Sequence, residues 1–225
     1  ARPAPDTPPR RVGRRTLQMA QYGNPEYWEE RYTRDPEPFD WFQRYSGIKE
    51  LVGQYLKKSD KILNVGAGNS RLTEEMFEDG YHTIDNVDVS ETCVRAMEEA
   101  HKDLRGVNWR VMDVLDMKDI PDGTYDAVID KAMLDSVLCG EGSSANAAKF
   151  LAGVSRTLKS VGVYFCVSYG IPDNRMTYLD NEAYGWTVKV HTVAKPTVSA
   201  AASAGAGKSG DPSSVHYIYV CQKTS

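Results

Sequence analysis

The sequence predicts an α/β fold built on a doubly wound, mostly parallel sheet. From residue 61 onward, short apolar runs alternate with segments of helical periodicity. The first apolar run leads into a turn that contains Gly66 and Gly68, and the next two runs end on Asp88 and Asp113. Strands that alternate with helices form parallel sheets, which bind ligands at the carboxyl ends of their strands. The predicted site is therefore the edge where these three strands end.

The remaining elements follow in chain order. A first helix is expected to begin after Asn24, because Asn is a good cap and Pro25 suits the first helical turn. Gly80 is expected to end the second helix and Ser90 to cap the third. We predict strands at 61–65, 83–88, 107–112, 125–130 and 163–168, and further helices at 70–79, 90–104 and 145–159.

The last part of the chain has a different pattern. Residues 186–191 and 215–220 alternate between apolar and polar side chains, which predicts an antiparallel pair at the edge of the sheet. The segment 199–214 between them is rich in Ala, Gly and Ser and is expected to be a flexible loop. At the other end, residues 1–21 are rich in Pro and Arg, so we expect a basic, flexible arm before a single domain over 22–225.

Composition narrows the class of protein. The 225 residues hold no run of eighteen apolar side chains, so no membrane span is expected. The net charge is −4, but residues 1–20 contain five Arg and one Asp, which leaves −8 on the rest. An acidic body argues against nucleic acid and suits a basic protein partner. The four cysteines form no metal-binding cluster, so we expect no metal, reduced thiols and a cytoplasmic location.

The glycine turn raises the question of which ligand it binds. A dinucleotide-binding turn needs a third glycine, and here Arg71 stands in its place. A phosphate-binding P-loop is excluded because no Gly-Lys-Ser/Thr follows the turn. Both common nucleotide motifs therefore fit poorly.

Three strand ends together predict S-adenosylmethionine. Gly66 and Gly68 would bind its methionine part, Asp88 the ribose hydroxyls, and Asp113 with Val114 the adenine. Either acid alone could equally be a helix cap or a turn former. The agreement of all three positions favours the cofactor.

Aromatic residues near the amino terminus suit the same ligand. Trp28 and Tyr32 lie four apart on one helix face, and Trp41 follows. Aromatic faces stabilise cations such as the sulfonium of S-adenosylmethionine by about 0.5–2 kcal/mol. The alternative is an ordinary aromatic face that covers the sheet.

Several motifs resemble one subgroup of the seven-strand methyltransferases, which includes enzymes that methylate lysine on translation elongation factor one-alpha. The resemblance covers residues 22–223. The motifs are Tyr27-Trp28-Glu29-Glu30-Arg31-Tyr32, Phe39-Asp40-Trp41-Phe42, Gly66-Ala67-Gly68-Asn69-Ser70, Met112-Asp113-Val114, Asp130-Lys131-Ala132-Met133-Leu134-Asp135 and Ala183-Tyr184-Gly185-Trp186. The resemblance implies a Rossmann-like sheet of seven strands with a C-terminal antiparallel hairpin.

The resemblance also implies roles for individual residues. It makes the following residues cofactor contacts: Trp28, Tyr32, Trp41, Gly66, Asp88, Val89, Asp113, Val114 and Lys131. The chain departs from the subgroup at Ala132-Met133, where Gly-Thr is usual, and at Asn64, where many such enzymes have an acid. The first departure faces the expected substrate side.

The favoured function is a protein-lysine methyltransferase that acts on an elongation factor-like, basic or lysine-presenting protein. Asp130 and Asp135, near the end of the fourth strand, are candidates to orient the incoming amine, although both could instead cap the following turn. Two alternatives remain at this point: a methyltransferase for a small molecule, and a binding scaffold without activity. The oligomeric state stays open.

Overall fold

Seven strands form one sheet in the order β3-β2-β1-β4-β5-β7-β6. The structure is a computed structural model that describes residues 21–196 and 212–224. Strands β1 to β5 run parallel, and β7 is antiparallel to both β5 and β6. The predicted mostly parallel sheet with a C-terminal hairpin is therefore confirmed. The strands are β1 (Ile62–Val65), β2 (Ile84–Asp88), β3 (Val107–Val111), β4 (Tyr125–Lys131), β5 (Leu158–Ser168), β6 (Trp186–Ala194) and β7 (Val215–Lys223).

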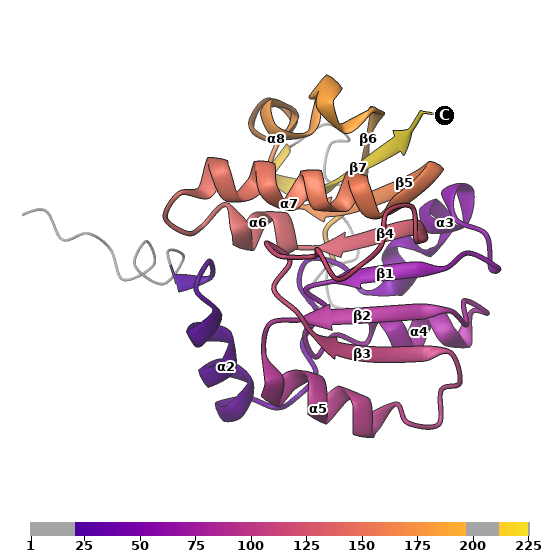
Figure 1. The fold of residues 1–225 in the computed structure, drawn as a ribbon, viewed down its shortest axis with the longest axis vertical. Helices are drawn as coiled ribbons and strands as arrows, with labels where there is room; N and C mark the ends of the chain where they lie inside the picture. The colour runs from indigo at the N-terminus through magenta and orange to yellow at the C-terminus, as the bar shows by residue number, and fades with distance from the viewer. Residues whose placement is uncertain (1–20, 197–211, 225) are drawn as a thin grey trace, which may run out of the picture.

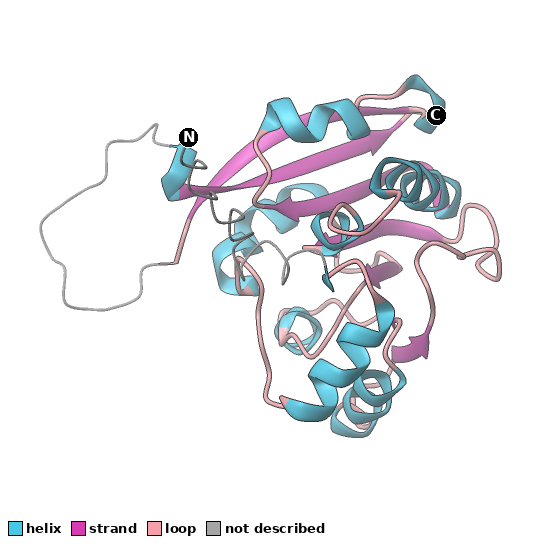
Figure 2. Ribbon diagram, turned by 90° about the vertical axis from the view of Figure 1, so that its left-hand side faces the viewer, coloured by secondary structure: helices cyan, strands magenta, loops and turns pink. Residues whose placement is uncertain are grey.

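Helices cover both faces of the sheet (Figure 2). One face packs against α6, α7 and α8, and the other packs against α3 and α4. Helix α5 packs on β3, and α2 lies against α5. The helices are α2 (Pro25–Arg34), α3 (Tyr45–Tyr55), α4 (Leu72–Glu78), α5 (Glu91–Ala100), α6 (Met133–Val137), α7 (Ser143–Thr157) and α8 (Pro172–Leu179).

The parallel strands β1 to β4 all point toward the same side of the molecule, where α2 and α6 lie (Figure 1). All four residues of β1 are buried, as expected of a strand covered by helices on both faces. The edge strand β6 instead alternates between more and less exposed positions. The chain therefore brings its glycine turn and its strand-end acids to one edge.

The predicted caps of α2 and α5 are present. The Asn24 side chain accepts a hydrogen bond from Glu26 N at 3.2 Å, and Ser90 Oγ accepts one from Cys93 N at 3.1 Å. Helix α5 nevertheless ends at Ala100, four residues before the predicted end. Capping preferences thus predicted where these two helices begin, whereas the sequence did not predict where α5 ends.

The prediction for the α7–β5 connection was wrong in its boundaries. Helix α7 ends at Thr157, and Leu158 already pairs with Tyr125 as the first residue of β5. The register then shifts between Tyr125 and Ala127, and Val161 has a left-handed φ of 58°. A β-bulge interrupts the strand here, which explains why sequence patterning began it only at residue 163.

Three helices, α3, α6 and α8, were not predicted. Helix α3 contains Gly47 and Gly53, and glycine lowers helix propensity, so its sequence does not resemble a helix strongly. The predicted arm lies outside the described residues except for Gln21. The predicted 199–214 loop lies outside them except for Pro212–Ser214, which form a short 3₁₀ helix. Within the described residues no helix is long and apolar enough to cross a membrane.

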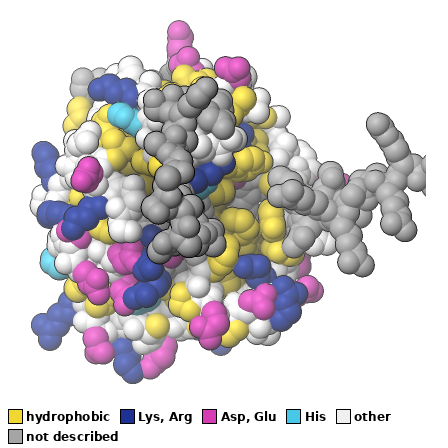
Figure 3. All heavy atoms as spheres, turned by 180° about the vertical axis from the view of Figure 1, so that it is seen from behind, with side chains coloured by type: hydrophobic (Ala, Val, Ile, Leu, Met, Phe, Trp, Pro, Cys, Tyr) yellow, Lys and Arg dark blue, Asp and Glu magenta, His cyan; other side chains and the backbone are white. Residues whose placement is uncertain are grey.

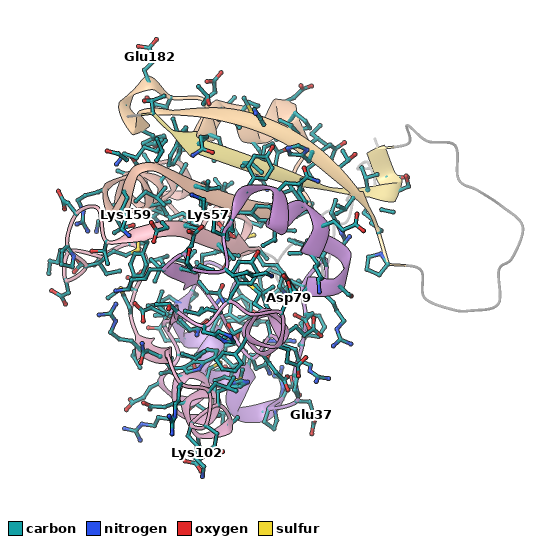
Figure 4. All side chains as sticks on the ribbon, turned by 90° about the vertical axis from the view of Figure 1, so that its right-hand side faces the viewer. Glu37, Lys57, Asp79, Lys102, Lys159 and Glu182 are labelled. Atoms are coloured by element: carbon teal, nitrogen blue, oxygen red, sulfur yellow. The ribbon has the colours of Figure 1, made fainter. Side chains whose placement is uncertain are left out.

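One carboxylate, Asp79, which follows α4, ties the end of that helix to α3 (Figure 4). It forms ion pairs with Lys49 and Lys58 and accepts a hydrogen bond from Tyr45 Oη at 2.6 Å. The donors lower the pKa of Asp79. Elsewhere on the surface, charged side chains of both signs are interspersed with apolar ones (Figure 3).

We expect Gly53→Ala to stabilise the fold. Gly53 lies inside α3, is exposed, and an added Cβ would meet no atom within 4 Å. Alanine should raise the free energy of unfolding by about 0.8–1.0 kcal/mol, or about 2–4 °C in melting temperature. Thermal unfolding followed by circular dichroism measures this change.

Gly47→Ala is the matched control in the same helix. Its Cβ would lie 2.4 Å from Gln43 Oε1, and the Gln43 amide is held by a 2.7 Å bond to Ala194 O. This variant should not gain stability. Equal gains for both variants would contradict the described environment of α3.

Candidate functional site

A cavity of about 470 Å³ lies at the carboxyl ends of β1, β2, β3 and β4. Its size falls within the range of small-molecule sites. Its outer wall is formed by helix α2 and by the segment that follows it. Residues 35–44 alone are here called the cover segment. The structure brings all of the predicted cofactor residues to this cavity: Trp28, Tyr32, Trp41, Gly66, Gly68, Asp88, Val89, Asp113, Val114 and Lys131.

The turn after β1 accepts only glycine at two positions. Gly66 and Gly68 have left-handed φ values of 59° and 54°. An added Cβ at Gly66 would lie 2.3 Å from Met133 Sδ, and one at Gly68 would lie 2.5 Å from Tyr32 Oη. The turn lines the cavity, and glycine is required at both positions by the backbone conformation and by the side chains packed on it.

Asp88 joins the glycine turn to the end of β2. Its Oδ2 accepts a hydrogen bond from Gly68 N at 2.9 Å, and its Oδ1 accepts one from Ser90 N at 3.0 Å. Burial raises the pKa of this carboxyl group, while the backbone donors oppose the shift. The residue therefore closes the turn that leads into the Ser90 cap of α5, and it also lines the cavity. Its contact with the ribose stays a prediction.

The ends of β2 and β3 supply the next part of the wall. Asp113 is exposed, and its Oδ1 accepts a hydrogen bond from Leu115 N at 2.8 Å, which makes it a turn former. The adjacent Val114 is buried and lines the cavity, as does the half-buried Val89. This part of the wall therefore combines two apolar side chains, Val89 and Val114, with the exposed acid Asp113.

The predicted aromatic residues form one group. The rings of Trp28 and Tyr32 stack at 5.8 Å between centroids, and Trp28 and Trp41 meet edge to face at 6.3 Å. Trp28 Nε1 donates to Tyr22 O at 2.8 Å, which fixes the indole. All three residues line the cavity, whereas the alternative prediction was an aromatic face that only covers the sheet.

Sequence reasoning missed other residues of the wall. Tyr22, Phe39, Phe42 and Tyr169 add further rings, and Arg31 lies on the cavity with its guanidinium 5.3 Å from the Phe39 centroid. Phe39 and Phe42 flank Trp41 in the sequence, so the aromatic spacing was a usable signal for these two. Tyr169 directly follows β5, and no acid at the end of that strand marks it as part of a site in the sequence.

The cover segment is attached to the glycine turn by side chains. Asn69 Nδ2 donates to Glu37 O at 2.6 Å, and Ser70 Oγ donates to the Asp40 carboxylate. Lys131 Nζ donates to Asp40 Oδ1 at 3.0 Å and to Trp41 O at 3.3 Å. The side chain of Glu37 itself points away from the body (Figure 4). Lys131, predicted as a cofactor contact, thus has its ammonium engaged by the cover segment.

Asp130 is not part of the cavity wall. It is fully buried, and its carboxylate accepts hydrogen bonds from Met133 N at 2.7 Å, Leu134 N at 3.0 Å and Tyr164 Oη at 2.6 Å. Burial raises its pKa to about 7. The geometry matches the capping alternative, because the carboxylate receives the first N–H groups of α6 and no face of it is open to a substrate.

Asp135 lines the cavity but is already paired. Its Oδ1 accepts from Arg175 Nε at 3.1 Å and from Ser168 Oγ at 2.6 Å, and its Oδ2 accepts from Tyr169 N at 3.3 Å. Burial raises the pKa of Asp135, and Arg175 opposes that shift. The carboxylate therefore holds the end of β5 in place beside the cavity.

The departure at Ala132-Met133 has a structural consequence. Ala132 has a left-handed φ of 82°, a conformation that costs a residue with a Cβ about 1–2 kcal/mol and that glycine adopts freely. Met133 places its sulfur over Gly66. The exchange of Gly-Thr for Ala-Met therefore strains one residue and adds an apolar side chain above the turn.

Comparisons with known proteins agree with this geometry. A family model described as a methyltransferase domain matches residues 63–166. The mouse EEF1A lysine methyltransferase 4 is 31% identical over 182 residues, which is 76% of this chain and 71% of that protein. The human eEF1A lysine and N-terminal methyltransferase is 33% identical over 181 residues, but this chain matches only about a quarter of its length (26%).

Solved structures share the fold at low sequence identity. The 1,6-didemethyltoxoflavin N1-methyltransferase of Burkholderia thailandensis, solved with S-adenosylhomocysteine, has a TM-score of 0.64 at 13% identity and covers 99% of this chain and 93% of its own. A SAM-dependent methyltransferase of Methanosarcina mazei has a TM-score of 0.57 at 15% identity, with 83% and 99% covered. This chain belongs to the S-adenosylmethionine-dependent methyltransferases, in the subgroup that includes the eEF1A lysine methyltransferases.

Proposed function

We propose that the protein is a protein-lysine N-methyltransferase that acts on an elongation factor-like protein. The observation that supports it most is the cavity at the strand ends, which combines a glycine turn for the cofactor with a wall of aromatic side chains. The names of the relatives, which refer to lysine on eEF1A, supply the substrate class. The basic character of the substrate and the cytoplasmic location remain predictions.

The wall residues fit the parts of S-adenosylmethionine. The backbone at Gly66 and Gly68 would bind the methionine part, and the Asp88 carboxylate would accept hydrogen bonds from the ribose hydroxyls. Val89 and Val114 would pack on the adenine, with Asp113 at its amine edge. The rings of Trp28, Tyr32 and Trp41 would surround the sulfonium, and Lys131 would hold Trp41 in place through the carbonyl of that residue.

The bound cofactor would supply an electrophilic methyl group to the amine lone pair, with S-adenosylhomocysteine and a proton as the other products. The protein contributes alignment and a dry environment. An apolar aromatic wall disfavours the ammonium form of a lysine and so promotes the neutral, reactive amine. Asp135 and Asp130 act by placing Tyr169 and α6, respectively, and not as bases on the substrate.

Transfer of labelled methyl groups tests the proposed function. The purified protein, with S-adenosylmethionine labelled in its methyl group, is incubated with purified eEF1A and separately with a cell lysate. We expect label on a lysine of eEF1A, located by mass spectrometry. Label found only in small metabolites would favour a small-molecule methyltransferase. Intact cofactor binding without any transfer would favour a silent scaffold.

Asp88→Ala should weaken S-adenosylmethionine binding. The ribose would lose a charged acceptor, which is worth about 1.5–3 kcal/mol, or roughly ten- to 150-fold in Kd. Isothermal titration calorimetry measures the change. Asp85→Ala is the matched control on the same strand: it loses bonds from Tyr125 Oη and Asn108 Nδ2 but does not line the cavity. An unchanged affinity in Asp88→Ala would contradict the proposed position of the ribose.

A further inference from the structure

Two ion pairs in the described part of the chain are buried on both sides. The side chains of Lys131 and Asp40 are 4% and 13% exposed, and those of Arg175 and Asp135 are 8% and 6% exposed. Buried ion pairs contribute little net stability compared with apolar packing. One member of each pair, Lys131 or Asp135, lines the cavity. The pairs therefore matter more for the position of the wall residues than for the stability of the fold.

The first pair holds the cover segment at Phe42. Lys131 Nζ binds both the Asp40 carboxylate and the carbonyl of Trp41, the residue before Phe42. Phe42 itself has a left-handed φ of 61°, and Gln43 N donates to Trp41 O at 2.7 Å to close the turn. A bulky residue in this conformation persists only where its surroundings enforce it, and such strain gathers at functional sites.

The second pair holds Tyr169 on the opposite side. Asp135 accepts from the Tyr169 backbone N–H, while Arg175 Nε also donates to Ser168 Oγ at 3.0 Å. The next residue, Gly170, packs directly on the guanidinium: an added Cβ would lie 2.3 Å from Arg175 Cζ. The loop after β5 is thus fixed on both sides of Tyr169.

The two residues held in this way meet at the rim of the cavity, because Tyr169 both lines the cavity and is exposed. The rings of Phe42 and Tyr169 lie 5.9 Å apart at an angle of 51°, and both line the cavity. Tyr169 is 48% exposed, so it is not merely core. The row of rings continues from Phe42 to Trp41 at 6.2 Å and on to Phe39 at 5.1 Å.

We propose that Phe42 and Tyr169 form the entrance that binds the alkylamine side chain of the substrate, and that the Lys131–Asp40 and Arg175–Asp135 pairs are positioning pairs that hold the two rings. The proposal rests on the proposed function. The apolar stem of a lysine packs across the exposed face of this ring pair, and its amine reaches the cavity beside the rings. The entrance selects a long, unbranched amine over a compact or acidic group.

Steady-state kinetics with purified eEF1A as the probe tests the entrance, together with S-adenosylhomocysteine affinity measured by calorimetry. We expect Tyr169→Ala to raise KM for eEF1A about tenfold, because the lysine stem loses the aromatic face on which it packs. The affinity for S-adenosylhomocysteine should stay unchanged. Tyr169→Phe should restore the wild-type KM, since the ring and not the hydroxyl makes the contact. Tyr169→Leu serves as a second variant that keeps apolar bulk if alanine lowers the melting temperature.

A paired substitution tests the positioning role. Lys131→Met with Asp40→Leu replaces one ion pair by apolar side chains, which such sites tolerate. The double variant should have a raised KM for eEF1A. Phe42→Ala should then raise KM by a smaller factor in the double variant than in the wild type. Val190→Ala, on β6 and outside the cavity, is the control for an exposed apolar residue.

The outcomes separate the two proposals. An active wild type whose KM is unmoved by both Tyr169→Ala and Tyr169→Leu overturns the entrance alone. A wild type that binds S-adenosylhomocysteine but labels no protein contradicts the proposed function and the entrance with it. A raised KM with unchanged S-adenosylhomocysteine affinity, rescued by phenylalanine, supports both.

Discussion

The arrangement of the whole site depends on the five-residue turn from Gly66 to Ser70. Its two glycines adopt left-handed conformations with Met133 and Tyr32 packed directly on them, so no larger residue fits. One side of the turn is tied to β2 through Asp88, and the other is tied to the cover segment through Asn69 and Ser70. Segments that are far apart in the sequence therefore meet at one short stretch of backbone.

This connection joins the cofactor side of the cavity to the substrate side. The backbone proposed to bind the methionine part is continuous with the side chains that hold the cover segment. That segment carries Trp41 and Phe42, one toward each side. The same turn therefore contacts the segments that form both walls.

Much of the fold follows from local chemistry. The caps Asn24 and Ser90, the alternation of strands and helices, and the C-terminal hairpin were all predictable, since each depends on neighbouring residues. The Val161 bulge and helix α3 were not, because a register shift and a glycine-containing helix depend on tertiary packing. The composition of these segments alone does not reveal them.

The site likewise has some features that could be predicted from the sequence and others that depend on tertiary contacts. Positions at strand ends could be predicted because parallel topology brings them together, and all ten predicted cofactor residues line the cavity. The use of each side chain depends on distant partners. Lys131 is engaged by Asp40, ninety-one residues earlier, and Asp130 is closed off by Tyr164. Such pairings leave no periodic signal, so the sequence predicted where these residues lie but not what they contact.

A crystal structure with bound S-adenosylhomocysteine tests the central claim most directly. The account predicts ribose hydroxyls on the Asp88 carboxylate, adenine beside Val114, and the sulfur facing the ring pair of Phe42 and Tyr169. A ligand bound elsewhere, or one whose sulfur faces away from that ring pair with the cover segment in its described position, would contradict it.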